Sequence, residues 1–145
     1  MSAQLLVQPY LFFEGRCEEA ATFYVKLLGA EITMLMRVKD NPEPQPPSGE
    51  GCSPPPGSEN KVLHMALRIG GGTVFCSDGM NSGQAPFQGF SLSINVPDEA
   101  EAERVFAGLA DGGEVRMPLA KTFFSPKFGM VADRFGVPWM VIVGQ

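Results

Sequence analysis

One order of secondary-structure elements occurs twice along this chain, and this repeat constrains the fold more than any other feature. Residues 17–28 carry apolar side chains at the spacing of a helix with one buried face. When this segment is moved along the chain by 82 positions, Phe23 falls on Val105 and Glu19 falls on Glu101. Around each helix the pattern predicts one strand before it and three after it. We therefore expect an α+β fold made of two βαβββ modules.

The first module is expected to begin with an aromatic strand and to end with a hairpin. Gly29 is a natural stop for the helix at 17–28, because glycine accepts the left-handed conformation that ends many helices. Three consecutive glycines at 70–72 predict the turn of the hairpin. The strands that we expect in this module are 5–13, 30–38, 62–69 and 73–77.

A proline-rich segment interrupts the first module at residues 40–60. It holds seven of the thirteen prolines and also Cys52, whose thiol we expect to be exposed and without function. Proline removes backbone donors and breaks regular structure, so we expect a long loop here. Loops of this length are uncommon in compact domains and often act as lids or are disordered.

The second module repeats the order with shorter connections. Asp98 has the side chain of a helix cap, and Glu101 three residues later completes a pattern similar to a capping box. Strands are expected at 90–96 and 114–117, and a closing hairpin at 128–143 turns at Asp133-Arg-Phe-Gly136. We expect one domain over 1–145, with module one at 1–80 and module two at 87–145.

Composition and charge limit the classes of partner. The chain has 16 acidic and 11 basic residues, a net charge of −5, and no basic cluster that would neutralise phosphates. Its three cysteines are dispersed, which is typical of reduced thiols, and no apolar run approaches the ~18 residues of a membrane span. With no secretory signal in the sequence, we expect a cytoplasmic protein that binds neither nucleic acid nor membrane.

Two signatures resemble those of one protein superfamily. The first runs from Pro9-Tyr-Leu-Phe-Phe-Glu14-Gly15 through Glu18-Glu19-Ala20 and Phe23-Tyr24 to Leu28-Gly29-Ala30. The second is Phe128-Gly-Met-Val-Ala-Asp133-Arg-Phe-Gly136-Val-Pro-Trp139. With the paired βαβββ order, they resemble the PhnB-like branch of the vicinal oxygen chelate superfamily. Glyoxalase I, extradiol dioxygenases and bleomycin-binding proteins belong to that superfamily, and PhnB-like proteins are often labelled 3-demethylubiquinone-9 3-methyltransferase-like.

This resemblance implies a glyoxalase-like fold, in which the strands form a cupped mixed sheet with the helices outside. It also implies a homodimer, because members pair or swap their modules. Metal enzymes of the superfamily hold a divalent ion with four residues, typically His or Glu. The corresponding positions in this chain are Gln8, Cys76, Ser91 (or Phe90) and Met140, and none of them is His, Asp or Glu. The resemblance therefore predicts the fold without the usual metal site, and no cofactor is predicted.

The candidate ligand-binding residues lie on the expected strands. Alternation places Gln8, Tyr10 and Phe12 on one face of the first strand, and His64 is the single histidine of the chain. His64 is a candidate general base, although a hydrogen-bonded strand histidine without catalytic function explains it as well. The aromatic residues could equally be core. For Cys76 the alternative is that it is a small buried core residue. The full predicted set is Gln8, Tyr10, Phe12, His64, Cys76, Ser91 and Met140.

Three functions remain open from the sequence. The first is a metal-free enzyme that acts on a small organic molecule bound in the cup. The second is a binding protein that sequesters an antibiotic or metabolite, as bleomycin-binding relatives do. The third is a methyltransferase, but the sequence offers no glycine-rich strand-to-helix turn for a nucleotide-like donor, because residues 70–72 lie between two strands.

Overall fold

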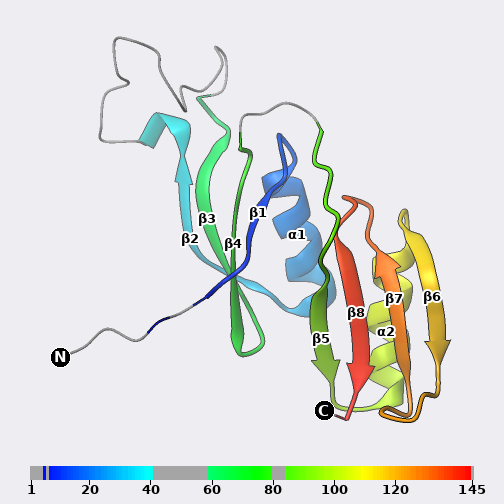
Figure 1. The fold of residues 1–145 in the computed structure, drawn as a ribbon. Coiled ribbons are helices and arrows are strands. Elements are labelled where there is room, and N and C mark those ends of the chain that lie inside the picture. Colours follow the sequence, from blue (N-terminus) through cyan, green and yellow to red (C-terminus); the bar gives the residue numbers. More distant parts are fainter. Residues whose placement is uncertain (1–4, 6, 41–58, 80–83, 145) are drawn as a thin grey trace. The chain divides into compact units, whose positions relative to one another are not determined.

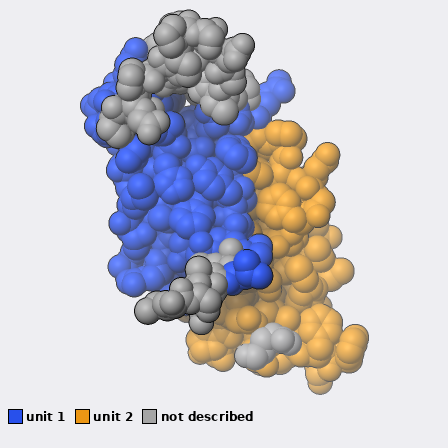
Figure 2. All heavy atoms as spheres, turned by 60° about the vertical axis from the view of Figure 1, so that its left-hand side comes forward, with its two compact units in different colours: residues 1–84 blue, residues 85–145 orange. Residues whose placement is uncertain are grey.

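The computed structural model describes residues 5, 7–40, 59–79 and 84–144, and its elements follow the predicted order twice (Figure 1). The chain divides into two compact units, residues 1–84 and 85–145, which Figure 2 colours separately. Helix α1 (Cys17–Leu28) and helix α2 (Glu99–Ala110) are 82 residues apart at both ends. The α+β architecture with two helices and two four-stranded mixed sheets is confirmed.

The sheet of the first unit has the strand order β1-β4-β3-β2. Strand β1 (Tyr10–Phe12) runs parallel to β4 (Gly72–Ser77), which forms an antiparallel hairpin with β3 (Val62–Ile69). Strand β2 (Glu31–Arg37) lies antiparallel to β3 at the edge, and a short 3-10 helix, η1 (Val38–Asp40), follows it. The register sets Leu11 beside Cys76 and Cys76 beside Met65.

Helix α1 covers one face of this sheet. Its buried side chains are Cys17, Ala20, Ala21 and Tyr24, and the buried strand residues on that side include Leu11, Met65, Leu67 and Cys76. Gly29 ends the helix in the left-handed conformation, with φ at 69°, as its position in the sequence predicts. In the described part of the chain, no helix is both long enough and apolar enough to cross a membrane.

The sheet of the second unit has the order β5-β8-β7-β6. Strand β5 (Leu92–Val96) runs parallel to β8 (Pro138–Val143), and β7 (Phe128–Ala132) lies antiparallel to both β8 and β6 (Glu114–Ala120). Helix α2 packs on the face that includes Gly129, because a side chain there would lie 2.7 Å from the Phe106 ring. Both units thus place a helix against one face of their own sheet.

The closing hairpin β7–β8 is confirmed, and its turn holds a buried carboxylate. Asp133 accepts hydrogen bonds from the backbone N–H groups of Phe135 (2.9 Å) and Val137 (3.1 Å). Its other oxygen accepts one from Trp139 Nε1 at 2.9 Å. Turn chemistry therefore explains Asp133, because a buried carboxylate is stable only when its oxygens are paired.

β2 and β4 differ from their predicted bounds by one residue at one or both ends, and three other strands differ by more. β1 spans Tyr10–Phe12 instead of 5–13, so Gln8 precedes the strand. β5 starts at Leu92 instead of residue 90, and Ser91 therefore also lies before its strand. β6 continues through Pro118 to Ala120, because an edge strand tolerates a residue without an N–H. Most of the predicted proline-rich loop, with Cys52, falls outside the described residues.

Candidate functional site

The candidate site is the face of the first sheet that α1 leaves uncovered. Strand pairing sets Tyr10 beside Phe75 and Phe75 beside Ala66, and it sets Phe12 beside Ser77. Alternation puts His64 on the same face as Ala66, two residues along β3. We call Tyr10, Phe12, His64, Phe75 and Ser77 the open-face cluster.

Four rings of the open-face cluster contact one another at distances typical of favourable aromatic pairs. The centroid of Tyr10 lies 4.9 Å from that of Phe12, 5.5 Å from His64 and 6.2 Å from Phe75. His64 and Phe75 are stacked, with centroids 5.4 Å apart and planes 29° apart. The side chains remain accessible, since Tyr10 is 38% exposed and Phe12 is 52% exposed. The cluster therefore presents an aromatic surface that the first unit does not bury.

Hydrogen bonds fix the polar atoms of the cluster. The Tyr10 hydroxyl lies 3.1 Å from His64 Nδ1, and the Gly79 backbone N–H donates to Ser77 Oγ at 3.1 Å. Partial burial raises the pKa of Tyr10, and a hydrogen bond with Ser77 opposes that shift. Tyr10 therefore keeps its proton at neutral pH and acts as a neutral hydroxyl between a serine and a histidine.

The structure brings together three of the residues that the sequence singled out, Tyr10, Phe12 and His64. Gln8 lies before β1, and Cys76 is on the opposite face, fully buried beside Met65. We therefore leave Cys76 out of the candidate site: it belongs to the core, in the alternative role foreseen for it.

Two predicted ligand residues, Ser91 and Met140, belong to the second unit. Met140 lies on β8 beside Met130 on β7 and Ser93 on β5, and Ser91 precedes β5. This row alternates with Gly129 and Val141, which lie on the side of α2, so it is on the uncovered face of the second sheet. The ligand-binding role of Ser91 and Met140 stays a prediction.

The sequence analysis missed Phe75 and Ser77. Both lie on the expected strand at 73–77, and strict alternation from Thr73 would have put them on one face. The parallel pairing of β4 with β1 brings them next to Tyr10 and Phe12, and that pairing is not visible in the sequence.

Two buried thiols lie under the cluster, on the side of the helix. Cys17 is the first residue of α1, and both Cys17 and Cys76 are fully buried. Hydrogen bonding with Cys76, together with burial, strongly raises the pKa of Cys17. Reactive cysteines have a lowered pKa and partial exposure, so this pair has the character of structural thiols.

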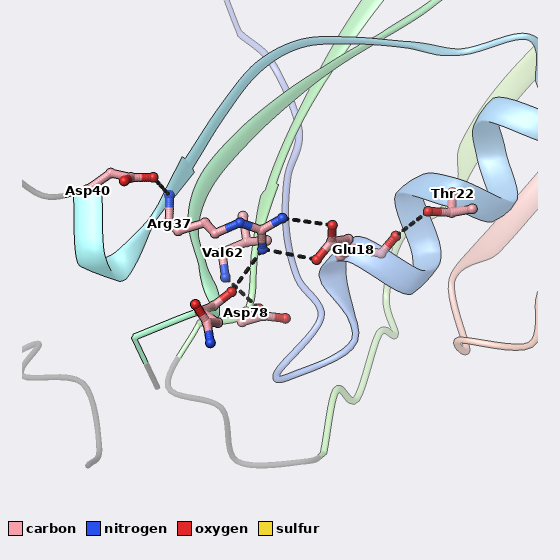
Figure 3. Close-up of polar contacts among 7 residues, drawn as sticks. Glu18, Thr22, Arg37, Asp40, Val62 and Asp78 are labelled. Atoms are coloured by element: carbon pink, nitrogen blue, oxygen red, sulfur yellow. Dashed lines mark hydrogen bonds and ion pairs between the residues drawn. The ribbon is translucent and has the colours of Figure 1, made fainter. Parts of the chain in front are cut away.

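A polar network holds the end of the first sheet to the start of α1 (Figure 3). The buried Asp78 carboxylate accepts from the backbone N–H of Cys17 at 2.8 Å and from that of Val62 at 2.7 Å. Arg37 donates to both carboxylate oxygens of Glu18 at 3.0 and 2.8 Å. The network anchors α1, β2 and β3 at the same end and thereby fixes the sheet that carries the cluster.

The divalent metal site of the superfamily needs several His, Asp or Glu side chains that converge on one point. Across residues 5, 7–40, 59–79 and 84–144, no three His, Cys, Asp or Glu side chains group so that they could hold an ion. Among the positions that correspond to metal ligands of the superfamily, Ser91 and Met140 are poor ligands for a hard or borderline ion. Cys76 is buried on the helix side of the sheet. We derive no step of the function through a metal.

Comparison with known proteins gives a consistent result. The chain matches the sequence model of the family described as 3-demethylubiquinone-9 3-methyltransferase over residues 6–142. It is 36% identical to Protein YjdN of Escherichia coli (strain K12) over 140 residues, which cover 94% of each chain.

Solved structures agree with this match. Protein PA1353 from Pseudomonas aeruginosa has a TM-score of 0.81 at 38% identity, covering 98% of this chain and 99% of that one. A putative 3-demethylubiquinone-9 3-methyltransferase, PhnB protein, from Bacillus cereus has a TM-score of 0.77 at 31% identity, covering 97% and 100%. The fosfomycin resistance protein FosX from Listeria monocytogenes shares the fold, with a TM-score of 0.61 at 13% identity over 99% and 96% of the two chains.

Proposed function

The chain belongs to the PhnB-like branch of the vicinal oxygen chelate superfamily, the family described as 3-demethylubiquinone-9 3-methyltransferase, and on that premise we propose that it binds a small organic molecule with a flat ring at the open-face cluster. The observation that carries the proposal is the accessible set of four touching rings with one polar pair, Tyr10 and His64, among them. Ligand sites typically combine apolar and aromatic walls with a few fixed polar groups, as this face does.

Exposed apolar surface adds area for such a ligand. Met34 pairs with Ala66 and Met36 with His64, so both methionines extend the cluster toward the edge of the sheet. Met34 is 43% exposed. Flexible thioethers adapt to ligands of different shape and contact aromatic rings favourably. The face therefore suits a planar molecule larger than one ring.

The proposed binding needs no metal, and the same residues offer a second candidate function. Histidine side chains serve as general acids and bases in many enzymes, so a metal-free enzyme in which His64 transfers a proton is the alternative to a sequestering protein. The family description names a methyltransferase. Here, however, the glycines at 70–72 join two antiparallel strands, so they do not form the strand-to-helix turn of a nucleotide site. We therefore propose no methyl transfer, and calorimetric binding of S-adenosylmethionine would contradict that view.

Nuclear magnetic resonance of the single histidine tests the binding proposal. The imidazole of His64 gives one set of ring signals, because the chain has one histidine. Titration with quinoline, benzylamine and bleomycin should shift these signals for at least one compound. Phe12→Ala should weaken that binding, whereas Phe123→Ala, which removes a fully exposed ring in the second unit, should not. Unmoved His64 signals with all three probes at saturating concentration would count against the proposal.

We also propose that the protein is a homodimer. The edge strand β2 exposes apolar side chains from both faces, with Ile32 on the helix side and Met34 on the open side, each 43% exposed. The edge strand β6 of the second unit does the same with Val115 and Met117. Long apolar edges invite pairing unless they are covered. Light scattering should give twice the monomer mass, and Ile32→Lys or Val115→Lys should lower it; a monomer at all concentrations would exclude the dimer.

A further inference from the structure

We propose that one soft monovalent metal ion, of the copper(I) and silver(I) class, binds on the open face of the first sheet where β3 meets β2. Its ligands are the thioether sulfurs of Met34 and Met36 and the Nε2 atom of His64. Such a site differs in chemistry from the divalent site of the superfamily, whose ligands are imidazoles and carboxylates. It needs no flat-ring ligand, so it is tested separately from the proposed function.

Strand pairing brings the three side chains to one face. Met36 is the register partner of His64, and Met34 is the partner of Ala66. The register between these two pairs is regular, so both methionines lie on the face of His64. Opposite residues of an antiparallel pair have Cβ atoms about 5 Å apart, and long side chains also reach their diagonal neighbours. Both sulfurs can therefore approach the same imidazole.

The imidazole is oriented for this role. The Tyr10 hydroxyl lies 3.1 Å from His64 Nδ1, and the strand order β1-β4-β3-β2 puts Tyr10 on the opposite side of His64 from the methionines. The two ring nitrogens point in nearly opposite directions, so Nε2 is directed away from Tyr10. With an ion on Nε2, the proton is on Nδ1 and is donated to the Tyr10 oxygen. A second contact of this kind orients most histidines that bind metals.

The ligand set selects the class of ion. Thioether sulfur is a soft ligand that favours copper(I), and imidazole also binds copper well. Magnesium and calcium need several oxygen ligands, which these three side chains do not offer. All three ligands are neutral, so a bound ion keeps its whole charge, and a single charge is less costly to hold than a double one.

The surroundings of the site accept one positive charge. The ring centroids of Tyr10 and Phe75 lie 5.5 and 5.4 Å from that of His64, and aromatic faces attract cations. Glu31 and Arg68 share this face on β2 and β3 and form an ion pair at 2.7 Å. Their charges offset each other, so the guanidinium does not repel the ion strongly. Solvent reaches the site, because Met34 is 43% exposed.

Silver(I) is the probe, because it has the soft chemistry of copper(I) and keeps its oxidation state in air. The Cys52→Ser variant serves as the background, so that this thiol does not take the ion. Silver nitrate is added in chloride-free buffer to protein with methyl-labelled methionine and labelled histidine. The first equivalent should shift the signals of Met34, Met36 and His64 and leave Met65, which is fully buried on the helix side, unmoved.

A rival site would give a different spectrum. The second unit carries a row of three paired methionines across β6, β7 and β8: Met117, Met130 and Met140. This row has no histidine, so we expect it to bind silver more weakly. A first equivalent that shifts these three signals and leaves those of His64 unmoved would overturn the inference, and so would the absence of any shift.

Variants test the ligands one by one. Leucine has nearly the volume of methionine but no sulfur, so Met34→Leu and Met36→Leu keep an apolar side chain. Each should weaken silver binding by about 100-fold or more, because loss of even an outer partner of a ligand typically costs 10–100-fold. Tyr10→Phe, which removes such an outer partner, should cost about 10-fold. Met117→Leu is the matched control and should leave the affinity unchanged.

Isothermal titration calorimetry measures these affinities, with circular dichroism to show that each variant is folded. Equal affinities of the background protein, Met34→Leu and Met36→Leu would refute the ligand set. Displacement of silver by excess magnesium would refute the preference for soft ions. Quinoline is titrated without silver in a separate experiment. Its failure to bind, with silver bound at the three ligands, would count against the flat-ring proposal alone.

Discussion

The two units start their helices by different means, although they repeat one order of elements. Helix α2 is capped locally, because Asp98 accepts a hydrogen bond from the N–H of Glu101 three residues later at 2.8 Å. Helix α1 has Arg16 at its N-cap without a side-chain cap bond, and Asp78 supplies the acceptor for Cys17 from 61 residues away. A cap contributed locally is visible in the sequence, whereas a cap contributed by a residue far along the chain appears only in the folded structure.

The first residues of the two helices also differ in burial. The first residue of α2, Glu99, is exposed, as acidic residues at a helix N-terminus commonly are. The first residue of α1, Cys17, is fully buried, and its backbone N–H donates to Asp78. We call Asp78 the remote cap of α1. It connects the start of α1 with β3 and with the end of β4, and these two strands carry most of the open-face cluster.

The largest expected effect is that of removing the remote cap. Asp78→Ala would leave the buried N–H groups of Cys17 and Val62 without acceptors, so we expect a loss of about 3 kcal/mol or more in the free energy of unfolding. Urea denaturation at pH 7 measures it. Asp111→Ala removes a well-exposed carboxylate as the matched control and should cost far less. Equal costs for the two variants would show that Asp78 is no cap.

The buried thiol of α1 predicts a weakness at alkaline pH. Because the pKa of Cys17 is raised in the folded protein, the unfolded chain loses the thiol proton at lower pH. The protonated thiol therefore contributes fully to the free energy of unfolding below the pKa of the unfolded chain, about 8.5, and this contribution is lost as pH rises above that value. At pH 9.5 the loss should be about 1.4 kcal/mol. The free energy of unfolding, measured by urea denaturation from pH 7.5 to 9.5, should therefore fall less steeply with pH for Cys17→Ala than for the wild type. Parallel pH profiles would contradict this assignment.

Removing the local cap should have a smaller effect than removing the remote one. Asp98→Ala takes away one exposed hydrogen bond to Glu101, and a lost helix cap typically costs about 1 kcal/mol. Asp98→Ser keeps a capping oxygen and serves as the control in the same denaturation experiment. If Asp98→Ala costs as much as Asp78→Ala, the contrast between the two helix starts does not hold.

The smallest effect is expected from the ion pair beside the remote cap. A hydrogen bond from Arg37 lowers the pKa of Glu18, so this stabilisation is present above the unfolded value of about 4.3 and is lost as pH falls through the folded value. The wild type should lose more stability than Glu18→Gln as pH falls from 5 to 3. Both groups are close to solvent, and the difference should vanish in Arg37→Gln. A difference that persists there would assign the effect to another partner.

Local patterns in the sequence predicted most of the fold but little of the candidate site. The bounds of α1 and β3, the Gly29 stop and the turn at Asp133 to Gly136 all depend on neighbours in the chain, and the structure confirms them. The position of Cys76 depends on which face of β4 turns toward α1. The places of Phe75 in the site and of Asp78 in the cap depend on a strand and a helix start more than ten residues away. Such contacts become visible only once the strands are paired.

The central claim is that the uncovered face of the first sheet binds a flat organic molecule at His64. Methyl-labelled methionine together with labelled histidine tests it in one titration with quinoline, because methionines lie on both faces of this sheet. The account predicts shifts at His64, Met34 and Met36, with Met65, fully buried on the helix side, unmoved. Binding that leaves His64, Met34 and Met36 unmoved while other methionines shift would contradict the account.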